Sequence, residues 1–138
     1  MFPPAAKYAT WIDKAYSPEL PALLMQREHL SQILVNVLLN AREATGEHGQ
    51  IRIQAAADTE ETIVVSIRDN GPGIAADRIE RVFEPYYSTK EKGTGLGLSI
   101  VRHNIEMYGG SARAESELGK GATFVLQFPT RTFMKLKS

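Results

Sequence analysis

The chain has 138 residues, of which 43% are apolar and 23% charged, and its 16 basic and 16 acidic side chains leave no formal net charge. This composition is typical of a soluble globular domain with its own core, and the balanced charge gives no strong field that would attract nucleic acid or an anionic membrane. Because the sequence has no cysteine, a disulfide scaffold, a thiolate nucleophile and cysteine-bound zinc are excluded. No apolar run approaches the roughly 20 residues that span a bilayer, and the first residues have no signal-peptide pattern. We therefore expect one soluble domain that fits within a longer protein.

The predicted elements begin with a loosely alternating edge strand within residues 7–16, which prolines end. A helix follows over residues 26–45, because its apolar side chains recur at i, i+3, i+4 and i+7. Only a narrow polar stripe remains on this helix, formed by His29, Gln32, Asn36, Asn40 and Glu43. Asparagine is a poor helix former, and an amide beside a buried face needs partners. The two asparagines, one turn apart, therefore either form hydrogen bonds with neighbouring loops or bind a ligand.

Two alternating runs, residues 50–57 and 61–68, predict a hairpin that leads into Asp69-Asn70-Gly71-Pro72-Gly73-Ile74. We call residues 69–74 the glycine segment. Strand alternation puts Asp69 on the same face as Ile63 and Ile67, where a core residue would be expected. A buried carboxylate is costly unless it is hydrogen-bonded, so Asp69 either caps local amides or receives a ligand that brings donors. The segment is also typical of an ordinary turn.

The second half of the chain predicts a short helix over residues 75–82, a polar loop over 83–92, a glycine loop over 93–98 and a helix that ends at Gly109 and Gly110. Two strands, residues 111–117 and 121–128, come last. Adjacent strands favour an α+β fold, which we expect to be a two-layer α/β sandwich with a mixed, mainly antiparallel sheet and helices on one face. We expect a single domain over residues 1–138, with a core at about 7–129 and a loose tail at 130–138.

The glycine loop opens a helix, so it offers backbone N–H groups and the positive end of a helix dipole to phosphate. Its spacing matches neither the dinucleotide fingerprint nor the P-loop. Lys90 would reach a terminal phosphate unless it is simply a solvated lysine. Asn40 offers one neutral oxygen, and magnesium takes only one or two protein ligands beside water and phosphate. The inward carboxylate of Asp69 can accept a hydrogen bond from an exocyclic amine such as that of adenine.

Four motifs follow one another along the chain. They are Asn36-Val37-Leu38-Leu39-Asn40-Ala41, the glycine segment, Phe83-Glu84-Pro85-Tyr86-Tyr87-Ser88-Thr89-Lys90 and Gly93-Thr94-Gly95-Leu96-Gly97-Leu98. In this order they resemble the asparagine, first glycine, phenylalanine and second glycine boxes of sensor histidine kinases. The resemblance extends over about residues 7–129. It implies the Bergerat ATP-binding fold that DNA gyrase, heat-shock chaperones and mismatch-repair ATPases share, with an ATP lid at about residues 84–94.

The resemblance further implies that the chain binds ATP and Mg²⁺ and donates the γ-phosphoryl group to a histidine on a separate dimerisation and phosphoacceptor domain, and that a response-regulator aspartate then receives it. It assigns Asn40 to magnesium, Asp69 to the adenine amine, and Asn36 and Lys90 to catalysis at the phosphates. The further residues that it assigns to the nucleotide are Gly71, Gly73, Ile74, Gly93, Thr94, Gly95, Leu96, Gly97 and Leu98. None of His29, His48 and His103 lies in the sequence context of the family's acceptor, so we expect no self-phosphorylation.

Two positions depart from the family. Glu43 stands where many of these kinases have a lysine, and Ala122 stands where the last strand usually has a threonine near the adenine. The alternative of a gyrase- or chaperone-type ATPase needs a glutamate at the position of Asn36, and an amide cannot take a proton at neutral pH. A degenerate nucleotide-binding scaffold is the other alternative. We expect a cytoplasmic domain with no direct contact with nucleic acid or membrane, in a parent protein that can be membrane-anchored.

Overall fold

The computed structural model describes residues 11–16, 23, 25–46, 49–58, 61–85, 87 and 97–130, with the backbone alone for 11–16. The strands are β1 (Trp11–Tyr16), β2 (Gln50–Ala57), β3 (Thr62–Asp69), β4 (Ser111–Ser116) and β5 (Ala122–Pro129). The helices are α2 (Arg27–Thr45), the 3₁₀ helix η2 (Glu80–Phe83) and α3 (Gly97–Met107). None of the helices described is both long and apolar enough to cross a bilayer.

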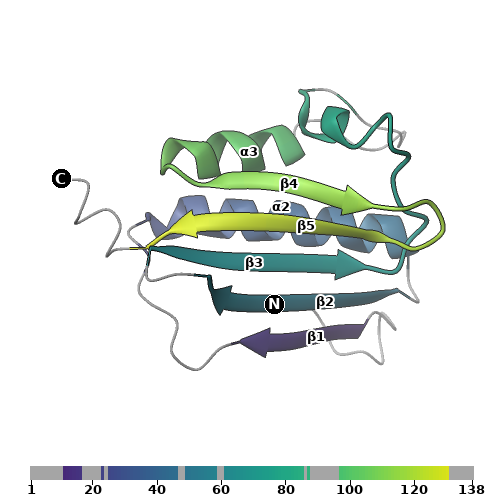
Figure 1. The fold of residues 1–138 in the computed structure, drawn as a ribbon, viewed down its shortest axis with the longest axis horizontal. Coiled ribbons are helices and arrows are strands. Elements are labelled where there is room, and N and C mark those ends of the chain that lie inside the picture. Colours follow the sequence, from purple (N-terminus) through teal and green to yellow (C-terminus); the bar gives the residue numbers. More distant parts are fainter. Residues whose placement is uncertain are drawn as a thin grey trace.

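The sheet has five strands in the order β1-β2-β3-β5-β4. β1 runs parallel to β2, and every other neighbouring pair is antiparallel. A parallel pair needs a crossover connection, and α2 lies in that connection. Figure 1 shows α2 and α3 on the same side of the sheet. The predicted two-layer α+β sandwich with a mixed, mainly antiparallel sheet is therefore confirmed.

The core lies between the two helices and the facing side of the sheet. Its helical side chains repeat at helix spacing, and its strand side chains alternate, as the sequence pattern predicts. The fully buried members include Ile33, Val37, Ala41, Val101, Ile105, Ile67, Phe124, Leu126 and Phe128. On the outer side of α2, Val35 and Leu39 are nearly half exposed, at 49% and 46%. The apolar stripe of α2 is thus wider than the face that it buries.

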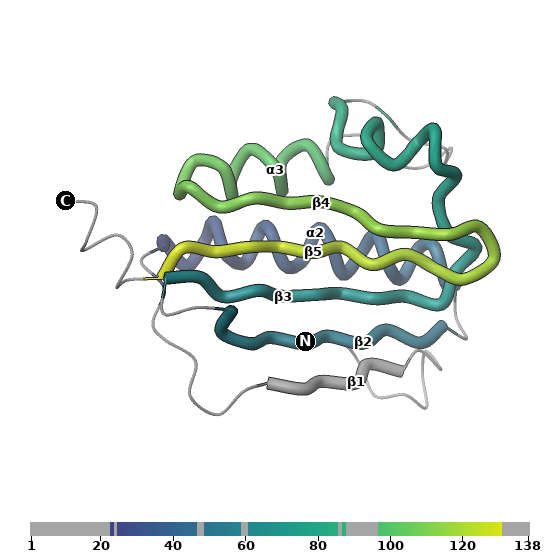
Figure 2. The backbone as a smooth tube through the Cα atoms, in the orientation of Figure 1, coloured from purple at the N-terminus to yellow at the C-terminus, as the bar shows by residue number. Residues whose placement is uncertain are grey.

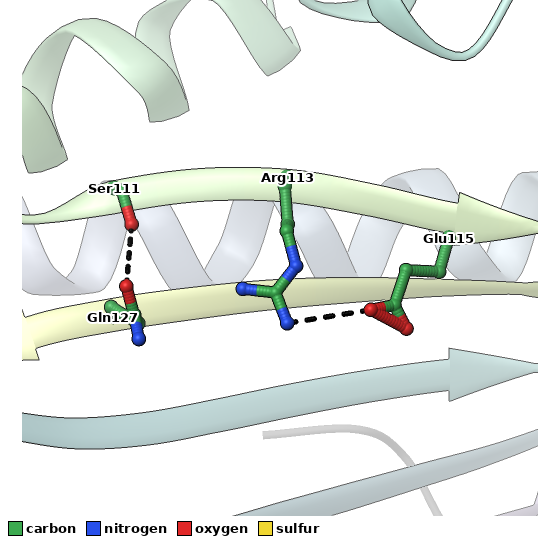
Figure 3. A network of polar contacts seen from close by, with 4 residues as sticks. All are labelled: Ser111, Arg113, Glu115 and Gln127. Carbon is green, nitrogen blue, oxygen red and sulfur yellow. Dashed lines mark hydrogen bonds and ion pairs between the residues drawn. The ribbon is translucent and has the colours of Figure 1, made fainter. Parts of the chain in front are cut away.

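The other face of the sheet carries polar side chains. Figure 3 shows Ser111, Arg113 and Glu115 of β4 and Gln127 of β5 on that face. Ser111 Oγ donates a hydrogen bond to Gln127 Oε1 at 2.9 Å, and Arg113 Nη2 pairs with Glu115 Oε1 at 3.3 Å. An antiparallel sheet can present one face to water, and the polar side chains on this face of the sheet are compatible with contact with water.

The short helix predicted over residues 75–82 is wrong in type and extent. Successive turns with hydrogen bonds from Arg78 N to Ala75 O and from Arg81 N to Arg78 O lead into η2. The helix stops at Glu84, which is extended at φ −72° and ψ 142°, because a residue before proline avoids the α region. Phe83 at its end is buried, packs edge-to-face on Phe124 and lies under the Arg102 guanidinium at 4.1 Å. These contacts fix η2 to the core.

Several predictions fall on residues that the structure does not describe. They concern the edge strand before residue 11, the polar loop at 86 and 88–92, the first four residues of the glycine loop and the tail after residue 130. The later predicted elements within the described ranges match the structure within one or two residues, namely the hairpin, α3, β4 and β5.

Candidate functional site

The first three residues of the polar stripe of α2, His29, Gln32 and Asn36, face α3 and the residue after it. His29 Nδ1 and the Tyr108 hydroxyl form a hydrogen bond of 2.5 Å between the start of α2 and the residue after α3. One turn further along α2, Asn104 Nδ2 donates to Gln32 Oε1 at 2.9 Å. The Asn104 side chain is only 6% exposed. As α2 advances, its partners come from earlier residues of α3, so the two helices run antiparallel.

Asn36 continues this series at the first residue of α3. Its Nδ2 donates to the Gln32 carbonyl at 2.9 Å, and its Oδ1 faces Gly97, where a Cβ would lie 3.4 Å away. The first N–H groups of a helix have no partner within the helix and carry the positive end of its dipole. Asn40 lies four residues, about 6 Å along the helix axis, beyond Asn36 and is half-buried. Both amides therefore lie at the end of α3 that suits an anion.

Asp69 is the last residue of β3 and is 2% exposed. The prediction that it faces the core is confirmed. Its Oδ1 accepts hydrogen bonds from Gly71 N at 2.9 Å and Ala122 N at 3.3 Å. Asp69 therefore caps local amides, which was one of the two expected roles.

The glycine segment packs closely against the β4–β5 turn (residues 117–121). Gly119 N donates to Pro72 O at 2.7 Å. A Cβ at Gly73 would lie 2.2 Å from the Glu117 carbonyl oxygen, and a Cβ at Gly121 would lie 2.0 Å from the carbonyl oxygen of Asp69. Both glycines have positive φ, at +80° and +83°, a region that other residues rarely adopt. Backbone packing is thus sufficient reason for a glycine at position 73.

These parts meet at one end of the molecule. A Cβ at Gly71 would lie 2.9 Å from the carbonyl oxygen of Ala44, in the last turn of α2 and one turn beyond Asn40. Asp69 and Asn40 therefore do not lie on opposite sides of the molecule. Figure 1 shows the end of β3 and the β4–β5 turn at this same end. The start of α3 faces this end but lies beside Asn36, midway along α2. Figure 2 shows the teal segment that carries η2 there as well.

The described site residues extend from the middle of α2 to this end of the molecule. Asp69, Gly71 and Gly73 lie at the end, Asn36 meets Gly97 midway along α2, and Asn40 lies between them on α2. Ile74 and Leu98 are partly buried and pack against the core. Lys90 and the loop residues Gly93, Thr94, Gly95 and Leu96 lie outside the described residues.

Ser116, which bonds the glycine segment to the β4–β5 turn, is not among the residues predicted from the sequence. The same is true of Asn104, the partner of Gln32. Strand alternation could have found Ser116, because this residue shares its face with the buried Ala112.

Comparison with known sequences gives the family. A profile described as "Histidine kinase-, DNA gyrase B-, and HSP90-like ATPase" matches residues 25–132. Sensor histidine kinase ZraS of Escherichia coli K12 is 40% identical over 116 residues, which make up 84% of this chain and 25% of ZraS. The chain thus spans about a quarter of the length of this relative.

Solved structures agree with the sequence comparison. The catalytic domain of histidine kinase ThkA matches with a TM-score of 0.81 and 35% identity, over 91% of this chain and 82% of that one. Full-length ShkA in complex with AMPPNP matches with a TM-score of 0.80 and 37% identity, over 91% of this chain and 27% of ShkA. ThkA in complex with response regulator protein TrrA matches with a TM-score of 0.76 and 31% identity, over 91% of this chain and 36% of that one. The chain therefore belongs to the histidine kinase-, DNA gyrase B- and HSP90-like ATPase family, and within it to the histidine kinase catalytic domains.

Proposed function

We propose that this domain binds Mg²⁺-ATP between the start of α3, beside Asn36, and the end of the molecule where α2 and β3 end. We further propose that it donates the γ-phosphoryl group to a histidine of a dimerisation and phosphoacceptor domain in two-component signalling. The observation that carries the proposal is the convergence of two helix amides, a buried carboxylate and a helix N-terminus. The AMPPNP complex of ShkA supports an adenine nucleotide, and the complex of ThkA with TrrA supports a response regulator as the later partner.

We assign Asp69 to recognition of the adenine base of ATP. Its carboxylate is held in one orientation by the amides of Gly71 and Ala122, so its acceptor direction is set before a ligand arrives. A charge-assisted hydrogen bond in such a buried place is strong. An exocyclic amine supplies the donor that this site would select, and the backbone of Gly71, Gly73 and Ile74 lies beside it.

Asn36 and the N-terminal N–H groups of α3, at Gly97 and Leu98, are assigned to the phosphates. Lys90, Gly93, Thr94, Gly95 and Leu96 belong to the same proposal through the resemblance of their motifs. Asn40 is the proposed magnesium ligand, because Mg²⁺ prefers oxygen and keeps most of its waters. When bound, the metal ion neutralises charge on the phosphate oxygens.

Asn36 also favours phosphoryl transfer over hydrolysis. Gyrase- and chaperone-type relatives use a glutamate at this position to activate water, and an amide cannot serve as a general base. Transfer to a histidine depends on positioning and charge stabilisation, which amides and a helix terminus can supply. His29 is bonded to Tyr108 and His103 lies on the exposed side of α3, so we place the acceptor on another domain.

The test begins with equilibrium binding of ATP to the 138-residue chain, with and without Mg²⁺. The chain is then incubated with labelled ATP, alone and with the phosphoacceptor domain of a sensor histidine kinase. We expect acid-labile label on the acceptor only, and none when its histidine is changed to glutamine. Absence of ATP binding would favour the degenerate scaffold, and rapid hydrolysis without the acceptor would favour the ATPase alternative.

A further inference from the structure

Ser116, the last residue of β4, bonds two separate segments at once. Its Oγ donates to the Gly121 carbonyl at 2.7 Å and accepts from the Ile74 N–H at 2.7 Å. The side chain is half-buried, and Ser116 pairs with Ala122 across the β4–β5 hairpin. A hydroxyl has a single donor, so its orientation is fixed once it donates to Gly121.

The two segments that Ser116 joins flank Asp69. Ile74 ends the glycine segment that Asp69 begins. Gly121 packs on the carbonyl of Asp69, and the next residue, Ala122, donates its N–H to Asp69 Oδ1 at 3.3 Å. The hydroxyl therefore closes a ring of contacts. The ring runs from Asp69 along the glycine segment to Ser116 and returns through Gly121 and Ala122.

We propose that Ser116 is a positioning residue for base recognition, and that its hydroxyl fixes the direction in which the Asp69 carboxylate accepts a hydrogen bond. The inference rests on the proposed function, in which Asp69 receives the adenine amine. Ser116 acts through the backbone on both sides of Asp69 and has no assigned contact with the nucleotide. An acceptor that is ordered before binding costs less to engage than one that must be ordered on binding.

We expect Ser116→Ala to weaken recognition of the adenine base and to leave the Mg²⁺ dependence of ATP binding unchanged. Loss of the two bonds leaves the glycine segment free to shift, and we expect about tenfold weaker ATP binding. Discrimination between ATP and GTP should fall by a similar factor, because the Asp69 contact selects the base. The factor by which Mg²⁺ strengthens ATP binding should not change, because Asn36 and Asn40 lie on α2. Ser116→Thr retains a hydroxyl and should restore affinity and selectivity.

Ser111→Ala is the matched control. Ser111 lies on the same strand, but its Oγ bonds Gln127 on the sheet face away from the helices, as Figure 3 shows. This variant should bind ATP and GTP as the wild type does. Amide hydrogen exchange gives a readout that needs no nucleotide. The Ile74 N–H should exchange faster in Ser116→Ala, and at the wild-type rate in Ser116→Thr and Ser111→Ala.

The proposal is overturned if folded Ser116→Ala retains wild-type ATP affinity and selectivity while the wild type binds ATP. An equal loss of affinity for ATP and GTP would also overturn it, because that result assigns the hydroxyl to general stability. Should Ser116→Ala not fold, Ser116→Cys keeps the side chain's size while its thiol bonds only weakly, and the same loss is expected. A wild-type chain that binds no ATP would refute the proposed function together with this inference.

Discussion

Asp69→Asn tests the base contact with the least disturbance of the fold. The Asp69 side chain is 2% exposed, and its Oδ1 accepts from the amides of Gly71 and Ala122. Asparagine has nearly the same shape and keeps one acceptor oxygen for these amides, but its other terminal group is an N–H₂ donor. In the variant, a donor would therefore face the donor of the adenine amine.

The magnitude follows from the kind of bond that is lost. A hydrogen bond to a charged group contributes about 1.5–3 kcal/mol, which corresponds to about a ten- to hundredfold rise in the Kd for ATP. Asp69→Ala would confound this measurement, because the amides of Gly71 and Ala122 would lose their acceptor. An unsatisfied buried donor costs about 1–3 kcal/mol, so affinity and stability would change together in that variant.

The assay is titration calorimetry with ATP and GTP, combined with the urea midpoint of each variant. Asp58→Asn is the control, because it removes the same charge from an exposed position after β2, at the far end of the β2–β3 hairpin. We expect weaker ATP binding in Asp69→Asn only, with a similar urea midpoint in both variants. An Asp69→Asn protein that binds ATP within about twofold of wild type would refute the base contact, since twofold is well under the smallest expected loss.

Three further predictions concern single residues at this end of the molecule. Asn40→Ala should abolish the Mg²⁺ dependence of ATP binding and spare the fold, because alanine is the better helix former; a retained dependence in calorimetry would exclude Asn40 as the ligand. Ala122→Thr restores a hydroxyl beside Asp69 and should strengthen ATP binding about two- to tenfold, whereas weaker binding would show that this buried position has no room for it. Gly121→Ala should lower the free energy of unfolding more than Gly119→Ala does, because both have φ near +82° but only the Cβ at Gly121 would meet another atom, at 2.0 Å; equal urea midpoints would contradict that reasoning.

Local patterns in the sequence were sufficient for most of the secondary structure. The spacing of Ile33, Val37 and Ala41 predicts the buried face of α2, and all three are fully buried. Strand alternation also predicts that Asp69 faces the core. These features depend on residues a few positions apart, where helix and strand periods act directly. The segment before Phe83 has no such period, and there the predicted helix was replaced by turns and a 3₁₀ helix.

Tertiary contacts decided the features that join distant parts of the chain. The sequence predicts an edge strand before residue 17 but contains no signal that makes β1 parallel to β2. Likewise, the polar stripe of α2 is visible in the sequence, but its partners Asn104 and Tyr108 are more than 70 residues away.

The order of the four motifs, the amphipathic helices and the inward carboxylate of Asp69 follow from the amino-acid sequence alone. The position of α3 beside Asn36, and the bonds of Ser116 between the glycine segment and the β4–β5 turn, depend on the packed fold. Periodicity along the chain sets which face of a helix or strand a side chain occupies. The partner that it meets on that face depends on how helices and strands pack, and that is a property of the whole fold.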